Sequence, residues 1–159
     1  SFLLTLSKFI FLRTFSKAYG LASLRIGYAI SKKIIIDSLL KVKLTFETSI
    51  LSQKIAMMAL DDQVFINNVT RNNSIELEKY YRFFNDNNIN FFKSFGNFIM
   101  IDLGSEKKSN ELYLKLLKKG VFVRLLNAFG LTNCVRITIG TSDENDYCIK
   151  IFKEILSKL

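Results

Sequence analysis

The 159-residue sequence contains no histidine, no proline and only two cysteines. Without histidine, the chain lacks the most common general base and the most common transition-metal ligand, so we expect no metal site. Cys134 and Cys148 fall in a predicted strand and a predicted helix, without the spacing of a metal or redox motif. We expect both thiols to be free and buried, which suits the reducing environment of the cytoplasm.

Long apolar runs are also missing. No stretch reaches the roughly 18 apolar residues that a membrane-spanning helix needs, so we expect no membrane partner. The apolar opening, residues 1–12 (SFLLTLSKFIFL), lacks the basic leader and the small-residue cleavage site of a signal peptide, and Lys8 interrupts it. We interpret it instead as part of a buried strand, and we expect that further sequence precedes it.

Negative charge is scarce relative to positive charge. The chain has 23 Lys and Arg against 14 Asp and Glu, which gives a net charge of +9. Such an excess is typical of proteins that bind nucleic acids, anionic membranes or anionic substrates. Here the lysines are scattered and form no stripe, which favours a compositional bias. We therefore expect no nucleic-acid partner; a basic nucleic-acid-binding module would instead show binding that weakens steeply with added salt.

Apolar residues are abundant, at 49% of the chain with 15 Phe, which is enough for a sizeable core. Apolar periodicity and turn residues predict alternating strands and helices. The continuous apolar run at 9–14 is typical of a buried strand in a parallel sheet. Ser31 is a predicted helix N-cap and Gly120 a predicted C-cap. The predicted strands are 9–14, 25–30, 90–93, 97–103, 121–125 and 134–139, and the predicted helices are 31–40, 48–60, 62–86, 106–119 and 143–158.

The segment 13–28 (RTFSKAYGLASLRIGY) holds the residues with the most specific chemistry. Lys17 falls on a turn after a predicted strand, where Phe, Tyr, Leu and Ala neighbours would partly desolvate it. Desolvation favours the neutral amine that attacks an aldehyde. The guanidinium of Arg25 and the hydroxyls of Ser16 and Thr14 suit a phosphate. An amine for an aldehyde beside donors for a phosphate is the equipment that pyridoxal phosphate requires.

Taken alone, a lysine in a turn is usually solvated and an arginine usually forms a surface ion pair. The whole segment, however, resembles the lysine motif of the class I/II, fold type I aminotransferases. It is most similar to the histidinol-phosphate aminotransferase branch, R-T-F/L-S-K-A-F/Y-G-L-A-G-L-R-I-G-Y, with Ser23 in place of the usual Gly. The resemblance implies that Lys17 binds pyridoxal 5'-phosphate covalently and moves a proton to or from the substrate α-carbon. It also implies that Ser16, Arg25 and Thr14 bind the cofactor phosphate.

Later segments resemble the same branch. Residues 52–62 resemble its S/A-Q-x-A-A-x-A-A-L-x-D helix, and residues 97–98 resemble the Asn-Phe of its small domain. Residues 120–124 (GVFVR) resemble its G-I-x-V-R strand. Residues 135–141 (VRITIGT) resemble its L-R-I-T-I-G-T strand. The similarity therefore extends over essentially the whole chain.

The resemblance assigns roles to the arginines of the last two segments. Arg136 would bind the substrate α-carboxylate through two parallel hydrogen bonds. Arg124 would bind the phosphate of histidinol phosphate or the distal carboxylate of glutamate. The alternative is that each is a strand arginine paired with a surface acid. In the complete enzyme, the amino group of L-glutamate would pass through the cofactor to the ketone precursor of histidinol phosphate, in histidine biosynthesis.

The resemblance also implies an α/β fold. Residues 1–30 would form the end of the large, mainly parallel-sheet domain of a fold type I enzyme, residues 31–86 linking helices, and residues 87–159 a small α+β C-terminal domain. Family members are much longer, and the resemblance covers only their C-terminal half. Their other half supplies the Asp that pairs with the ring nitrogen, without which the ring is a poor electron sink. We therefore expect little activity from this chain alone. The resemblance also implies that the complete enzyme is a cytoplasmic homodimer.

One segment departs from the branch, and other functions remain open. Residues 43–49 (KLTFETS) stand where the branch often has Pro-Phe-Asn or Pro-Tyr-Asn, with Glu47 in place of Asn. An aromatic aminotransferase or a threonine-phosphate decarboxylase of the same fold would share the lysine motif. A further alternative is a non-catalytic fragment that needs a separately encoded N-terminal half.

Overall fold

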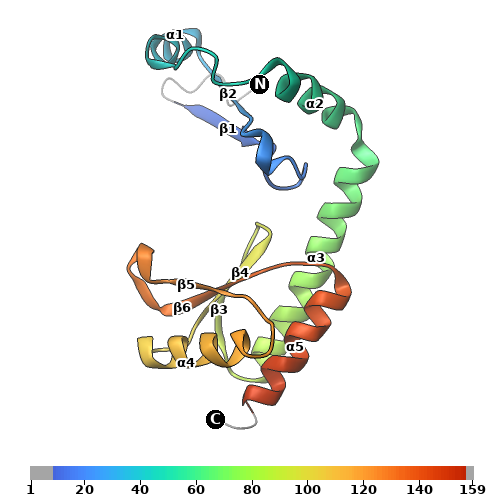
Figure 1. Ribbon diagram of the computed structural model, residues 1–159, viewed down its shortest axis with the longest axis vertical. Helices are drawn as coiled ribbons and strands as arrows, with labels where there is room; N and C mark the ends of the chain where they lie inside the picture. Colours follow the sequence, from blue (N-terminus) through green and yellow to red (C-terminus); the bar gives the residue numbers. More distant parts are fainter. Residues whose placement is uncertain (1–8, 157–159) are drawn as a thin grey trace. The chain divides into compact units, whose positions relative to one another are not determined.

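The computed structural model describes residues 9–156 and divides into two compact units between Val69 and Thr70 (Figure 1). Most of the apolar opening, residues 1–8, lies outside the described part, as do residues 157–159. The elements are β1 (Ile10–Thr14), η2 (Ala22–Leu24), β2 (Gly27–Ser31), α1 (Lys33–Val42), α2 (Ile50–Asp61), α3 (Gln63–Asp86), β3 (Asn90–Phe92), β4 (Phe98–Asp102), α4 (Glu106–Leu117), β5 (Arg124–Leu126), η3 (Asn127–Phe129), β6 (Leu131–Thr138) and α5 (Ser142–Leu156).

In the first unit, β1 and β2 pair as an antiparallel hairpin, from Ile10 opposite Ser31 to Thr14 opposite Gly27. The strand predicted at 9–14 is present, but its assignment as a buried strand of a parallel sheet is wrong. Phe11 is its only half-buried residue, and the other four residues are exposed. The apolar run did not reveal the direction of pairing, which follows from the connection. Residues 15–26 form a compact loop, and such a loop permits only an antiparallel return.

Helix α1 does not begin at the predicted cap, and helix α2 has a cap that was not predicted. Ser31 is not the N-cap of α1, because it ends β2 and its hydroxyl donates to the carbonyl of Phe9. Lys32 precedes α1 without a side-chain cap. Helix α2 has a true cap in Ser49, whose hydroxyl accepts the backbone N–H of Ser52 at 3.0 Å. In the described part of this unit only Phe15, Ser52 and Ala56 are buried, and the other residues are half-buried or exposed.

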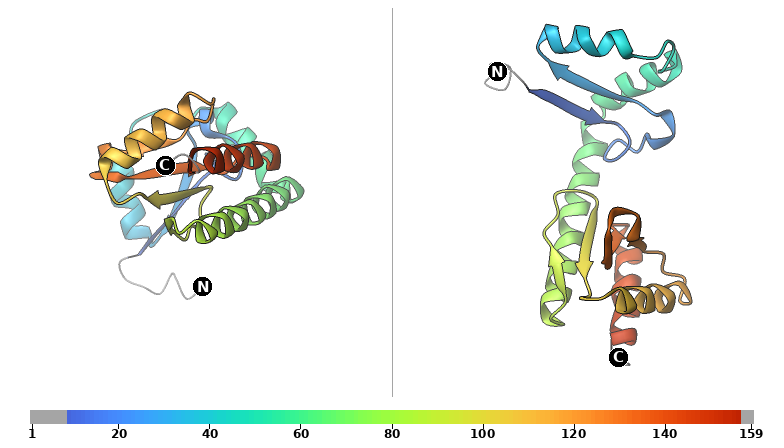
Figure 2. Two further views of the ribbon diagram at one scale, coloured as in Figure 1. Left: turned by 90° about the horizontal axis from the view of Figure 1, so that it is seen from below. Right: turned by 90° about the vertical axis from the view of Figure 1, so that its left-hand side faces the viewer.

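The second unit is a four-stranded antiparallel sheet in the order β3-β4-β6-β5, with helices packed on one face (Figures 1 and 2). Alternation along the strands decides which side chains face the helices. Ile99 and Ile101 of β4 are fully buried, whereas Met100 between them points to the other face. Helices α3, α4 and α5 contribute further core residues, which include Tyr80, Phe84, Leu116, Ile151 and Phe152.

Helix α4 ends as the sequence predicts. Gly120 has φ +76°, the left-handed conformation that favours glycine. Its N–H donates to the carbonyl of Leu117 at 3.0 Å, and the N–H of Val121 donates to the carbonyl of Leu116 at 3.0 Å. These two bonds form a Schellman motif. The motif turns the chain directly from α4 toward β5, which carries Arg124.

Residues expected to link the domains contribute to the second core. The C-terminal half of α3 supplies Tyr80 and Phe84, which are almost fully buried there. The division at residues 30/31 and 86/87 itself remains a prediction. Cys134 and Cys148 are free and buried, as expected, and burial raises the pKa of both thiols. Of the helices in residues 9–156, none combines the length and apolarity that spanning a membrane requires.

A buried polar cluster fixes the end of β6. Asn145 of α5 donates from Nδ2 to Glu76 Oε2 and to the carbonyl of Gly140, each at 3.0 Å, and its Oδ1 accepts the N–H of Gly140 at 3.1 Å. Glu76 is 2% exposed, and its second oxygen lies 3.1 Å from the ammonium of Lys79. These bonds tie α3 and α5 to the residues that follow Arg136 on β6.

Replacing Asn145 by Ala leaves one oxygen of the buried Glu76 carboxylate, Oε2, without its donor, while Oε1 keeps the Lys79 ammonium. We expect N145A to lower the free energy of unfolding by roughly 2–4 kcal/mol, the cost of breaking a buried charged hydrogen bond. Urea unfolding followed by far-UV circular dichroism measures it. The matched control is Asp146→Ala, the next residue of α5, whose side chain is 61% exposed and should cost less than about 1 kcal/mol. Equal losses in the two variants would show that the cluster has no special role.

Candidate active site

Lys17 begins a tight turn at the end of the β1–β2 hairpin. The N–H of Gly20 donates to the carbonyl of Lys17 at 2.8 Å, and Gly20 has φ +70°, which a side chain would disfavour. The N–H of Leu21 returns to the carbonyl of Phe15 at 3.0 Å. The backbone on both sides of Lys17 is therefore held by hydrogen bonds, which fixes the point where its side chain leaves the loop.

The aromatic residues around Lys17 pack on each other. Phe15 is 4% exposed, and its ring centroid lies 4.8 Å from that of Tyr19 and 5.9 Å from that of Tyr28. Lys17 itself is exposed. The expectation that these neighbours desolvate it is therefore wrong for the described residues, because the rings form a small core beneath the turn and do not cover the lysine. Within residues 9–156, the Lys17 amine has no hydrogen-bond or ion-pair partner.

The other candidates of this segment lie in the same loop. The N–H of Phe15 donates to the carbonyl of Ile26 at 3.2 Å, so the hairpin pairing continues one step beyond the strands. This places Ser16 and Arg25 at the two ends of one loop. Arg25 has the left-handed φ of 50°, and one guanidinium N–H donates to the carbonyl of Ala22 at 3.0 Å. A guanidinium has five donors, so most remain for an anion.

Thr14 has a structural contact of its own. Its hydroxyl oxygen accepts the backbone N–H of Ser16 at 3.1 Å, which holds the start of the loop. The hydroxyl proton of Thr14 can still donate to a further acceptor. An exposed amine, a guanidinium and hydroxyls thus emerge from one short loop, and their chemistry fits a molecule that carries both an aldehyde and a phosphate.

Gly27 has a role that the sequence did not reveal. A Cβ at this position would lie 2.6 Å from the carbonyl oxygen of Arg13 on the opposite strand. Real Cβ atoms do not approach backbone oxygens so closely, so only glycine permits this pairing of β1 with β2. The glycine sits directly beside Thr14, at the mouth of the loop that carries Lys17. The sequence shows a glycine two residues after Arg25, but the reason for it becomes clear only from the pairing of β1 with β2.

The two later arginine candidates come together on the sheet of the second unit. Arg124 of β5 and Arg136 of β6 occupy paired positions on neighbouring antiparallel strands. Side chains at paired positions share a face and lie close together, and like charges placed so repel each other. The Nε atom of Arg136 is buried and has no hydrogen-bond partner among residues 9–156. A repelling pair of cations with an unsatisfied buried donor is suited to binding an anion.

Each guanidinium of the pair also lies against an aromatic ring, which the sequence did not predict. The Cζ of Arg136 lies 5.1 Å from the ring centroid of Phe98, and the Cζ of Arg124 lies 5.5 Å from that of Phe129. Both distances are within the range of cation–π interactions. Strand alternation could have placed Phe98 on this face. The pairing of β4 with β6, which brings it beside Arg136, was not deducible from one sequence.

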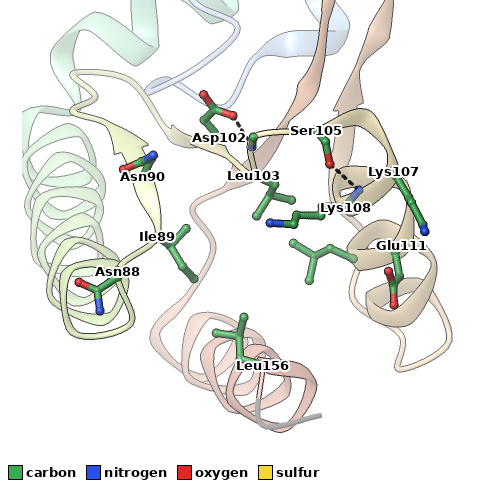
Figure 3. A pocket seen from close by; sticks show the side chains of 12 residues that line it. Asn88, Ile89, Asn90, Asp102, Leu103, Ser105, Lys107, Lys108, Glu111 and Leu156 are labelled. Atoms are coloured by element: carbon green, nitrogen blue, oxygen red, sulfur yellow. Dashed lines mark hydrogen bonds between the residues drawn. The ribbon is translucent and has the colours of Figure 1, made fainter. Parts of the chain in front are cut away.

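A separate cavity of about 730 Å³ lies in the second unit, where β4 runs into α4 (Figure 3). Two of its polar side chains, Asp102 and Ser105, are engaged in local hydrogen bonds. Asp102 accepts the N–H of Gly104 at 2.8 Å, and Ser105 caps α4 through the N–H of Lys108 (Figure 3). Asp102 also accepts the side-chain N–H of Asn133 at 2.6 Å. None of the predicted site residues lines this cavity, and we assign it no part in the active site.

Comparison with known proteins agrees with the geometry. Residues 2–152 match the model of the family described as aminotransferase class I and II. The chain belongs to this family. Its relatives include histidinol-phosphate aminotransferase 1 of Bacillus cereus and histidinol-phosphate aminotransferase of Geobacillus thermodenitrificans, each 42% identical over 147 residues. These alignments cover 92% of this chain but only 39% and 40% of the relatives, so the chain spans about two fifths of their length.

Solved aminotransferase structures share the fold. Histidinol-phosphate aminotransferase from Sinorhizobium meliloti, in complex with pyridoxal-5'-phosphate, superposes with a TM-score of 0.85 at 28% identity, over 98% of this chain and 43% of that one. A Methanococcus jannaschii protein, whose active site is described as similar to that of kynurenine aminotransferases, gives a TM-score of 0.81 at 26% identity, over 95% and 43%. The α/β fold of a fold type I aminotransferase is thus confirmed.

Gly27→Ala tests whether the close strand approach holds the lysine loop. The added methyl must push β1 away from β2, and overpacking of this kind costs roughly 1–3 kcal/mol. We expect the hairpin amides to exchange their hydrogens with solvent about ten to a hundred times faster, as measured by mass spectrometry. Ala29→Ser, at an exposed position of the same strand, is the control and should leave exchange unchanged. Unaltered protection in G27A would contradict the role assigned to Gly27.

Proposed function

We propose that this chain is the part of a pyridoxal-phosphate-dependent aminotransferase that carries the cofactor lysine. The observation that carries the proposal is the loop between β1 and β2. It presents the unpartnered amine of Lys17 together with Ser16 and Arg25, on a segment similar to the lysine motif of the family. This donor set fits the aldehyde and the phosphate of the cofactor.

The residues of the loop have separate tasks. Lys17 holds the cofactor through its side-chain nitrogen and, once released from that bond, carries a proton to or from the substrate α-carbon. Ser16 and Arg25 orient the phosphate, with Thr14 holding the loop and offering a further hydroxyl. When bound, the cofactor supplies a conjugated ring that accepts the electron pair from the α-carbon.

The arginine pair of the second unit binds the substrate. Arg136 donates hydrogen bonds to the α-carboxylate of L-glutamate. Arg124 donates to the distal carboxylate of glutamate or to the phosphate of histidinol phosphate. The unsatisfied Nε of Arg136 supports this assignment, because a buried donor without a partner is costly until a ligand arrives. Relatives named histidinol-phosphate aminotransferase make that substrate the favoured one. Both substrates in this pair of reactions are anionic, as the two guanidinium groups require.

The complete activity requires more polypeptide than these residues. The chain spans 39% of the Bacillus cereus relative. In the described part of the first unit, large apolar side chains remain exposed from Val42 to Leu51, including Phe46 at 99%. We propose that the remaining part of the large domain covers this surface, completes the cofactor site and allows the protein to form a homodimer.

Reduction with borohydride tests the lysine assignment. We expect pyridoxal phosphate added to the chain to be fixed by borohydride at Lys17, as located by peptide mapping, and Lys17→Arg to abolish that label. Lys54→Arg, which changes an exposed lysine of α2, is the matched control and should label like the unaltered chain. A label that maps mainly to any other lysine, or that persists in K17R, would overturn the assignment.

Complementation tests the reaction. We expect the chain alone to transfer amino groups from L-glutamate far more slowly than a mixture with the N-terminal part of the Bacillus cereus relative. In the mixture, the ketone precursor of histidinol phosphate should be the best acceptor, ahead of aromatic 2-oxo acids. Preference for an aromatic acceptor would identify an aromatic aminotransferase, and loss of carbon dioxide from threonine phosphate would identify a decarboxylase. Either result would refute the substrate named here.

A further inference from the structure

On the face of the second sheet that is not covered by helices, a row of side chains runs across the strands and changes from apolar to cationic. Phe92 of β3 is paired with Met100 of β4, Met100 with Arg136 of β6, and Arg136 with Arg124 of β5. Paired residues project from the same face. The row therefore has an apolar half and a cationic half, and Arg136 lies where the two meet.

Phe98 lies beside this row, next to Arg136. On β4 it is two residues before Met100, so it shares the same face, and its paired residue on β6 is Thr138. Phe98 is thus a diagonal neighbour of Arg136, a separation that an aromatic ring and a long side chain can bridge. The guanidinium carbon of Arg136 lies 5.1 Å from its ring centroid. The pairing is fixed further by the N–H of Ile139, which donates to the carbonyl of Asn97 at 2.9 Å.

The opposing arginine has a ring of its own. After β5, the 3-10 turn η3 reverses the chain and ends at Gly130, which has φ +74° and donates to the carbonyl of Asn127 at 3.0 Å. This turn brings Phe129 over Arg124, at 5.5 Å. Without such rings, two flexible cations at paired positions would repel each other and turn apart into solvent.

We propose that Phe98 is a positioning residue for Arg136. Its ring holds the guanidinium plane so that the donors of Arg136 and Arg124 face the anionic groups of one substrate, in spite of their mutual repulsion. The attraction of the cation to the face of the ring partly offsets this repulsion before the ligand arrives. The proposal rests on the anion-binding role given to the two arginines in the proposed function. In addition, the affinity of Arg136 and Arg124 for an anion depends on the ring of Phe98, which carries no charge of its own.

The test uses the 159-residue chain, inorganic phosphate as the probe, and nuclear magnetic resonance of arginine Nε–Hε groups. Arg136→Lys identifies the Arg136 signal by removing it. We expect phosphate to shift this signal in the unaltered chain. Phe98→Leu should move the signal before phosphate is added and weaken phosphate binding roughly three- to tenfold, as expected for the loss of a cation–π contact. Phe98→Tyr, which keeps a ring, should restore both values.

The matched control is Phe92→Leu, which removes an exposed phenylalanine from the same face two strands away from Arg136. It should leave the Arg136 signal and the phosphate affinity unchanged. If F98L also leaves both unchanged, or if F98Y fails to restore them, the positioning role is refuted while anion binding stands. If the unaltered chain binds no phosphate at Arg136, the anion site itself is refuted, whatever lysine the cofactor labels.

Discussion

The close approach of two strands at Gly27 is the constraint on which the cofactor assignment depends. The carbonyl of Arg13 occupies the space where any other residue would have a Cβ, which allows β1 and β2 to pair up to the loop mouth. One more backbone bond, from Phe15 to Ile26, closes the loop. Lys17 then leaves from a glycine-terminated turn, with Ser16 and Arg25 at the two ends of the same loop. Three kinds of functional group are brought together by backbone geometry alone.

In the second unit, backbone pairing likewise places the two proposed substrate-binding arginines side by side. Antiparallel pairing of β5 with β6 forces two arginines to adjacent positions, although their charges repel. The cation–π contacts of the two guanidinium groups with Phe129 and Phe98 partly offset this repulsion. The buried hydrogen bonds between Asn145, Glu76 and Gly140 anchor the chain just beyond β6 to α5 and α3. An anion bound between the two guanidinium groups would relieve this electrostatic cost, which is the basis of the substrate role that we propose for the pair.

Local sequence signals predicted the positions of the helices and strands well, but they did not predict which strands pair with each other. Gly120 as a helix cap followed from its conformational freedom, and the helices from apolar periodicity. The apolar run at β1 was misassigned as buried and parallel, because neither burial nor strand direction is encoded in the run itself. The same limit hid Gly27, Phe98 and Phe129. Their roles depend on which strand or turn faces them, and a single sequence does not contain that information.

The site residues were found by a different route. Lys17, Arg25, Arg124 and Arg136 were named from resemblance, since an isolated lysine or arginine is usually a solvated surface residue. Within residues 9–156, the amine of Lys17 has no partner, and the guanidinium of Arg25 bonds back to the carbonyl of Ala22. Arg124 and Arg136 occupy paired positions, and the Nε of Arg136 is a buried donor. The desolvation expected at Lys17 is absent, because Phe15, Tyr19 and Tyr28 pack beneath the loop and leave the amine exposed.

The most direct measurement is a crystal structure of the chain, combined with the N-terminal part of its relative, after soaking with pyridoxal phosphate. We predict a covalent bond from the Nζ of Lys17 to the cofactor, and hydrogen bonds from Ser16 and Arg25 to the phosphate of that same molecule. A cofactor joined to another lysine, or a phosphate held away from Arg25, would contradict it.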